Sequence, residues 1–204
     1  MWEWTADPIG QYSANSAYNV IMEGAAAVTQ EDCFVKLWSI KVPSKIEIFA
    51  WRLIRDRLPT RQNLQQRQVQ VAKTSCPFCR DSEENACHLF FHCSKIQPIW
   101  WEAMSWLNLK GAVPLTPKQN FTQHIGLQAD GVRSNRWQCW WLVLTWSIWK
   151  LRNSIVLSNA TFNANKLFED AIFILWTWLR NFEKGFTDHF NRWSSSIRQA
   201  FLYQ

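Results

Sequence analysis

Four side chains that could bind one metal ion lie within eighteen residues of this chain. Cys76 and Cys79 form a Cys-x2-Cys pair, eight residues separate Cys79 from His88, and four more separate His88 from Cys93. Zinc prefers four thiolate or imidazole ligands in a closed tetrahedron, and a Cys-x2-Cys turn lets two sulfurs reach the same ion. The spacing therefore predicts a zinc site built from Cys76, Cys79, His88 and Cys93.

Two neighbouring residues leave the choice of ligands open. Cys87 or His92 could replace an adjacent ligand, and His88 and His92 would share a helix face at i, i+4, although the thiolate of Cys93 is the stronger fourth ligand. A different interpretation is a group of unrelated buried cysteines, since free Cys is often buried. The density of ligand types favours the metal site.

The sequence lacks the recognisable motifs of enzyme active sites. The sequence holds no G-x-S-x-G, no H-E-x-x-H and no two adjacent aspartates. A polymerase or nuclease needs such carboxylates to hold paired metal ions. Glu83 and Glu84 lie beside the zinc ligands, but four ligands close a zinc site, so we interpret them as a solvated acidic turn. We therefore predict that the chain is not an enzyme.

A basic segment leads into the cysteine motif. Residues 41–75 hold eight Lys and Arg against two acidic residues, whereas residues 1–40 hold one Lys against five. The predicted nucleic-acid-binding residues are Lys45, Arg52, Arg55, Arg61 and Arg67. They are expected to bind RNA or DNA weakly and without strong sequence preference through phosphates. The alternative is an ordinary solvated helix face.

Helices must position these groups. After Pro43-Ser44, apolar residues recur at i, i+3, i+4 and i+7, which is typical of a helix with one buried face; they are Ile46, Phe49, Ala50 and Leu53. Thr60 is expected to cap a short helix through Arg67, and a further helix is expected over 94–109. Long helices are expected over 134–158 and 164–184. The apolar run 137–149 is too short to span a membrane and is followed by Lys150, so a buried helix is predicted.

The predicted fold is mainly α: a small N-terminal hairpin formed by Trp2–Trp4 and Gln11–Ser13, helices around a zinc knuckle, then a C-terminal pair of long helices. The expected domains are a zinc-binding module over 1–110, a linker over 111–133 and a helical extension over 134–204. Six cysteines with no disulfide pattern indicate a reducing compartment. No secretory signal is recognisable at the N-terminus, so an intracellular location, nucleus or cytoplasm, is expected.

Taken together, these residues resemble the zinc-binding region that follows the reverse transcriptase domain in plant-type non-LTR (LINE-like) retrotransposon polyproteins. The matching positions are Trp4, Gly10, Tyr12-Ser13, Ser16-Ala17-Tyr18, Trp38, Val42-Pro43, Lys45, Phe49, Trp51-Arg52, Arg57-Leu58-Pro59-Thr60, Asn63-Leu64, Arg67, Cys76-Pro77-Phe78-Cys79, Glu84, His88-Leu89-Phe90, Cys93 and Trp100. They cover roughly the first half of the chain.

The resemblance implies a non-catalytic module that binds zinc through Cys76, Cys79, His88 and Cys93 and assists nucleic-acid handling. The catalytic domain of the parent polymerase is expected to be absent here, and such a domain is a possible partner. Two alternatives remain open: a structural zinc module for protein–protein docking, and a retroelement remnant without retained function.

Overall fold

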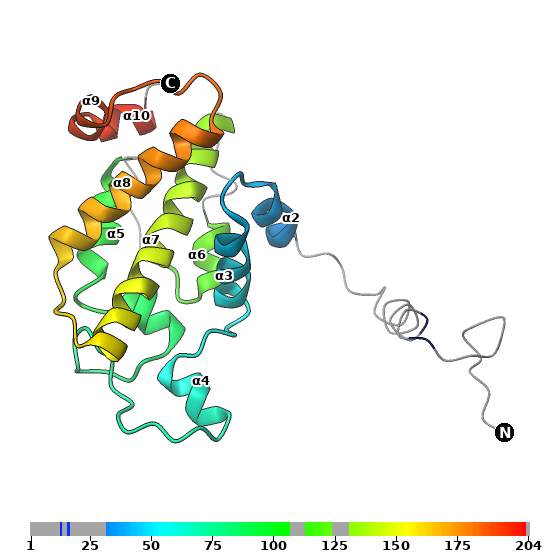
Figure 1. Ribbon diagram of the computed structural model, residues 1–204, viewed down its shortest axis with the longest axis vertical. Coiled ribbons are helices and arrows are strands. Elements are labelled where there is room, and N and C mark those ends of the chain that lie inside the picture. Colours follow the sequence, from blue (N-terminus) through cyan, green and yellow to red (C-terminus); the bar gives the residue numbers. More distant parts are fainter. Residues whose placement is uncertain (1–12, 14–15, 17–31, 107–112, 124–130, 203–204) are drawn as a thin grey trace. The chain divides into compact units, whose positions relative to one another are not determined.

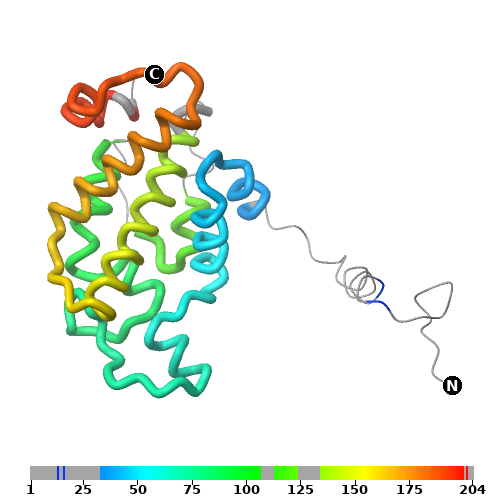
Figure 2. The backbone as a smooth tube through the Cα atoms, in the orientation of Figure 1, coloured from blue at the N-terminus to red at the C-terminus, as the bar shows by residue number. Residues whose placement is uncertain are grey.

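The computed structural model describes residues 13, 16, 32–106, 113–123 and 131–202, and contacts between residues divide the chain into two units, 1–35 and 36–204. Regular structure in the described residues is helical (Figures 1 and 2). The helices are α2 (Asp32–Ser39), α3 (Ser44–Ile54), α4 (Arg61–Gln66), the π-type turn η1 (His88–His92), α5 (Gln97–Trp106), α6 (Pro117–Thr122), α7 (Gly131–Ser158), α8 (Ala164–Phe182), α9 (Phe190–Ser195) and α10 (Ile197–Leu202). The mainly helical prediction is confirmed, whereas the predicted hairpin falls largely outside the described residues.

The centre of the unit 36–204 is α7, which packs against α3, α8, α10 and η1 (Figure 1). Successive side chains from Trp140 to Thr145 are all at most 1% exposed. A helix that is apolar on every side must be surrounded by other elements, and this explains the central position. The prediction of a buried helix is confirmed, and none of the helices in the described ranges is long and apolar enough to cross a membrane.

Helix α8 covers α7 with one apolar face. Leu167, Ala171, Leu175 and Trp178 recur at helical spacing and are buried, while Asn163 caps the helix by accepting a hydrogen bond from the backbone N–H of Lys166. Its N-terminal bound agrees with the predicted residue 164, and the observed end is Phe182.

The predicted buried face of α3 is also observed, because Ile46, Phe49, Ala50 and Leu53 are all buried. Thr60 caps α4 as expected, since its hydroxyl accepts a hydrogen bond from the backbone N–H of Asn63. Helix α3 packs against α7, so the first part of the basic segment lies alongside α7.

The range 111–133, which was predicted to be a linker, contains a described helix. Residues 117–122 form α6, which starts with a capping box between Thr116 and Gln119 and contacts α3. Asn120 on this helix is buried and accepts a hydrogen bond of 2.7 Å from the indole N–H of Trp141. In addition, α10 packs on α5 and α7. The division into domains at 110 and 134 stays a prediction.

Candidate metal centre

The first ligand pair lies in a tight turn closed by backbone hydrogen bonds. The N–H of Arg80 donates to the carbonyl of Cys76 at 3.0 Å, and the N–H of Cys76 donates to the carbonyl of Ser82 at 2.7 Å. Arg80 has a φ of 66°, in the left-handed region that non-glycine residues seldom adopt. The chain therefore reverses at Arg80, so that both cysteine side chains emerge on the same side of the turn.

The second pair is held by the wider turn of η1. The side-chain oxygen of Asn85 accepts a hydrogen bond of 2.8 Å from the N–H of His88, which fixes the start of the turn. The N–H of Cys93 then donates to the carbonyl of His88 at 2.8 Å, an i to i−5 bond. This π-type turn accounts for the convergence of two residues that are five positions apart.

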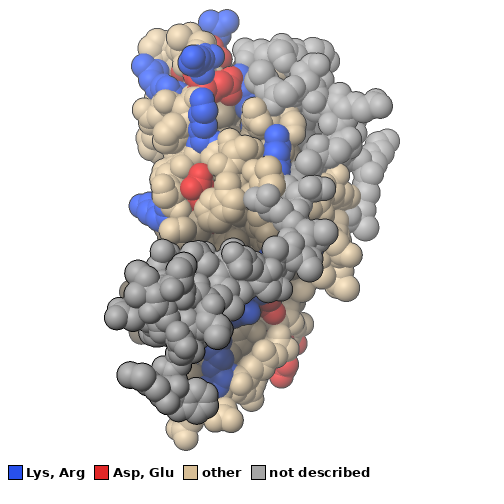
Figure 3. Space-filling model, turned by 90° about the vertical axis from the view of Figure 1, so that its right-hand side faces the viewer, with Lys and Arg blue, Asp and Glu red and all other residues tan. Residues whose placement is uncertain are grey.

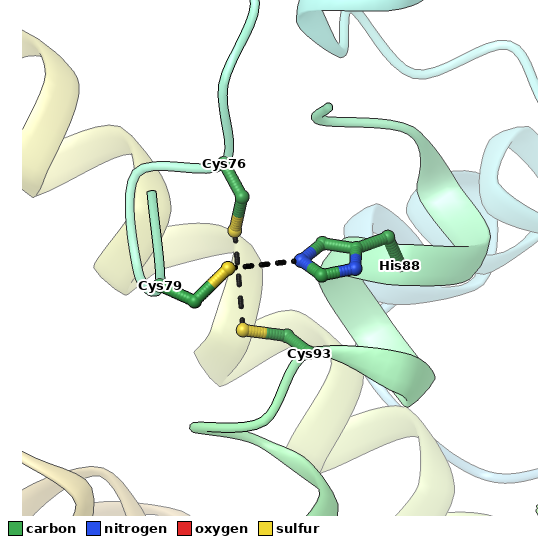
Figure 4. A group of neighbouring side chains, drawn as sticks. All are labelled: Cys76, Cys79, His88 and Cys93. Carbon is green, nitrogen blue, oxygen red and sulfur yellow. Dashed lines mark hydrogen bonds between the residues drawn. The ribbon is translucent and has the colours of Figure 1, made fainter. Parts of the chain in front are cut away.

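The four side chains point toward one centre (Figure 4). Their ligand atoms all lie within 4.8 Å of one another, with 3.9 Å between the sulfurs of Cys76 and Cys93 and 3.3 Å between the sulfur of Cys79 and Nε2 of His88. With Zn–S bonds of about 2.3 Å and Zn–N bonds of about 2.0 Å, a tetrahedron has S···S edges of about 3.8 Å and S···N edges of about 3.5 Å. The observed separations are close to these edges, so the group fits a zinc ion.

The two facing cysteines influence each other's protonation. Their hydrogen bond, supported by the backbone N–H groups of Phe78 and Cys79, lowers the pKa of Cys76 to about 5. The same hydrogen bond and burial raise the pKa of Cys93. Near neutral pH the metal-free pair therefore retains one proton, and that proton must leave when a metal ion binds both sulfurs.

The neighbouring candidates lie outside this group of four. Burial and the nearby charge of Asp56 raise the pKa of the Cys87 thiol, which disfavours its thiolate. The Nε2 atom of His92 instead lies 3.3 Å from the backbone carbonyl of Leu115. The structure thus brings together the four ligands that the spacing predicted and places Cys87 and His92 elsewhere.

Aromatic packing anchors both ligand pairs. Phe90 and Phe91, between the second pair, are fully buried, and the carbonyl of Phe90 accepts a hydrogen bond of 2.7 Å from the Trp100 indole. Phe78 of the first pair packs on Phe162, with ring centroids 5.2 Å apart. Side chains of α5 and of the loop between α7 and α8 therefore support the turns that carry the predicted ligands.

Glu84 corrects the interpretation of an acidic turn. Its carboxylate is fully buried; Oε1 accepts hydrogen bonds of 3.0 and 2.8 Å from the guanidinium of Arg152, and Oε2 lies 3.5 Å from Nε of Arg61. Glu83 is exposed, as expected. The charge pattern did not predict burial of Glu84, because its partner Arg152 lies on α7, 68 residues away; the signal that set Glu84 apart from Glu83 was its place among the family-matching positions.

The predicted nucleic-acid-binding residues separate into two groups. Lys45, Arg52, Arg55 and Arg67 are exposed, whereas the side chain of Arg61 is only 15% exposed. Besides its contact with Glu84, Arg61 donates a hydrogen bond to the carbonyl of Ser75. Its guanidinium is therefore engaged within the fold. Lys and Arg side chains lie at several separate places on the face shown in Figure 3.

Known proteins give an independent comparison. Residues 12–100 match the family described as zinc-binding in reverse transcriptase, and this range contains all four ligands. An Arabidopsis thaliana protein named "Putative ribonuclease H protein" is 22% identical over 161 residues, which are 78% of this chain and 25% of that protein. The chain thus spans about a quarter of the length of this curated relative. No solved structure matches the chain. The predicted resemblance is confirmed: residues 12–100 match the family described as zinc-binding in reverse transcriptase.

Proposed function

We propose that this chain is a non-catalytic, zinc-stabilised module of a retrotransposon-type polyprotein that assists nucleic-acid binding. The observation that carries the zinc assignment is the group of three sulfurs and one imidazole nitrogen, whose atoms all lie within 4.8 Å of one another. Four protein ligands leave no open position for a substrate, which is the arrangement of structural zinc sites. A zinc ion here would join the turn that carries Cys76 and Cys79 to the turn η1, and it would not activate water.

The surroundings of the site support a non-catalytic role. A zinc hydrolase needs a nearby carboxylate as general base, and Glu84 is tied to Arg152 and Arg61. The ribonuclease H in the relative's name describes that larger protein. We expect no polymerase, nuclease or ribonuclease H activity from this chain. Activity that persists through repurification and is lost with a point variant of this chain would refute the proposal.

Zinc content tests the metal assignment. We expect one zinc per chain by elemental analysis after expression with added zinc. Cys79→Ser should lose the metal, because it removes a ligand, and Cys87→Ser should keep it, because Cys87 lies outside the group of four. Equal zinc loss from both variants, or a wild-type protein without zinc, would contradict the assignment.

Nucleic-acid binding is proposed for the exposed face of α3. Lys45 and Arg52 lie about two helical turns apart on that face, and Arg55 and Arg67 are exposed at later positions of the basic segment. Three to four phosphate contacts with a single strand would give a slope of log affinity against log salt of roughly −2 to −3. Arg61 is omitted from this set because its guanidinium is bound internally.

The test replaces Lys45, Arg52 and Arg55 by Glu and measures binding to a labelled single strand at several salt concentrations. The charge-matched control replaces the exposed residues Lys184, Arg180 and Arg192 by Glu. We expect the α3 variant to bind the strand more weakly, with a shallower dependence of log affinity on log salt, and to retain zinc. The control variant should show smaller changes in the affinity and in the salt dependence. Equal effects of the two variants would show that the α3 face is not the binding surface.

A further inference from the structure

A groove of about 490 Å³ lies between α3 and α7, beside the basic face. Its floor is aromatic: Phe49 and Trp149 are almost fully buried, and Trp146 is partly exposed. Phe49 and Trp146 pack edge to face, with ring centroids 5.1 Å apart. Two apolar side chains on the walls face solvent, because Ile48 is 47% exposed and Leu157 is 79% exposed. Such exposed apolar groups beside a pocket are typical of a binding site.

The charged groups that line this groove are all cationic. They are Lys45, Arg52 and Arg152. Arg152 is ion-paired with the buried Glu84, which also lies 3.5 Å from Arg61, whereas Lys45 and Arg52 are the exposed cations of the groove. An occupant should therefore combine an apolar, flat group with negative charge.

We propose that this groove takes an unpaired nucleobase of a single-stranded nucleic acid whose neighbouring phosphates contact Lys45 and Arg52. This inference rests on the proposed function and specifies its ligand. A base in a duplex has both faces covered by its neighbours, whereas a base in a single strand can turn outward and pack against aromatic and apolar side chains. The groove would therefore give this chain a preference for strands that carry unpaired bases.

The experiment compares a labelled 20-nucleotide deoxythymidine strand with an abasic strand of the same length and charge, using fluorescence anisotropy on the full zinc-loaded chain. We expect the base-containing strand to bind at least about fivefold tighter, which corresponds to about 1 kcal/mol, the low end for one stacked base. The salt slopes of the two strands should agree, because both carry the same phosphates.

A double surface variant and a control test whether the groove causes the preference for the base-containing strand. Ile48→Ser with Leu157→Ser removes the apolar walls without touching the core, and we expect the fivefold preference to disappear while abasic binding is unchanged. The matched control is Leu115→Ser, at a position that is 68% exposed and outside the groove. The control should retain the preference.

The possible results distinguish the two proposals. If neither strand binds, the proposed function itself fails. If both strands bind equally, or if the preference survives in the double variant, nucleic-acid binding stands and the groove is not a base site. If the double variant abolishes self-association in sedimentation experiments and leaves the preference intact, a second copy of the chain covers the groove, which overturns the proposal.

Discussion

Replacing Arg152 by Met should destabilise the chain far more than a surface substitution. The change leaves the carboxylate of Glu84 buried with one cation fewer, since Glu84 is fully buried and the Arg152 side chain is 7% exposed. Removing one partner of a buried ion pair costs about 3–5 kcal/mol. Because Arg61 stays 3.5 Å from the second oxygen, we expect a loss of about 3 kcal/mol, at the low end of that range.

Urea unfolding of zinc-loaded protein measures this loss, and a double-mutant cycle with Glu84→Gln isolates the interaction. The double variant should be less destabilised than the sum of the single variants, with a coupling energy of at least about 1 kcal/mol. Lys166→Met serves as the control, because its ion pair with Asp170 is exposed and should contribute about 0.5 kcal/mol or less. A loss below about 1 kcal/mol for Arg152→Met, or additive single variants, would refute the reasoning.

Three further predictions concern other parts of the fold. Arg80→Ile should weaken zinc binding about fivefold in a chelator competition, because a β-branched residue in the left-handed region costs about 1–2 kcal/mol, whereas Arg80→Gly should not weaken it. Asn120→Ala should lower the free energy of unfolding by about 1–3 kcal/mol, because it leaves the buried indole N–H of Trp141 without its acceptor. Burial raises the pKa of Cys139 to about 12 from an ordinary value of 9.0. Between these values the unfolded thiol loses its proton while the folded thiol keeps it, so stability should fall by about 1.4 kcal/mol per pH unit, and Cys139→Ala should remove that contribution from the alkaline unfolding profile.

Local sequence patterns were sufficient to predict the long helices and the residues that form the Cys/His group. The spacing of Ile46, Phe49 and Leu53 predicted the buried face of α3, because one apolar face is a property of consecutive residues. The apolar run in α7 predicted its burial for the same reason. The four predicted ligands converge because they lie within eighteen residues, so two short turns are enough to align them.

Contacts between distant segments could not be read in the same way. Glu84 and Arg61 both looked like exposed charges, since each lies in a polar segment. The buried carboxylate of Glu84 pairs with Arg152 from α7, and Arg61 lies 3.5 Å from the same carboxylate. The helix α6 lies within the range 111–133 that was predicted to be a linker, and Pro117 is the first residue of that helix, a position that favours proline. The groove between α3 and α7 could not be predicted either, because it is lined by two segments that are far apart in the sequence.

The contact between Glu84 and Arg152 joins two segments that the ribosome synthesises at different times. The ribosome produces residues 76–93 well before α7, so metal can occupy the knuckle while Glu84 is still hydrated and Phe90 still lacks the ring of Trp149. A chain released at residue 110 would keep that hydration of Glu84 and expose the aromatic rings, which favours aggregation of partly folded species. Zinc capture by residues 76–93 should therefore come early, and burial of the Glu84 carboxylate should follow when α7 packs against this region.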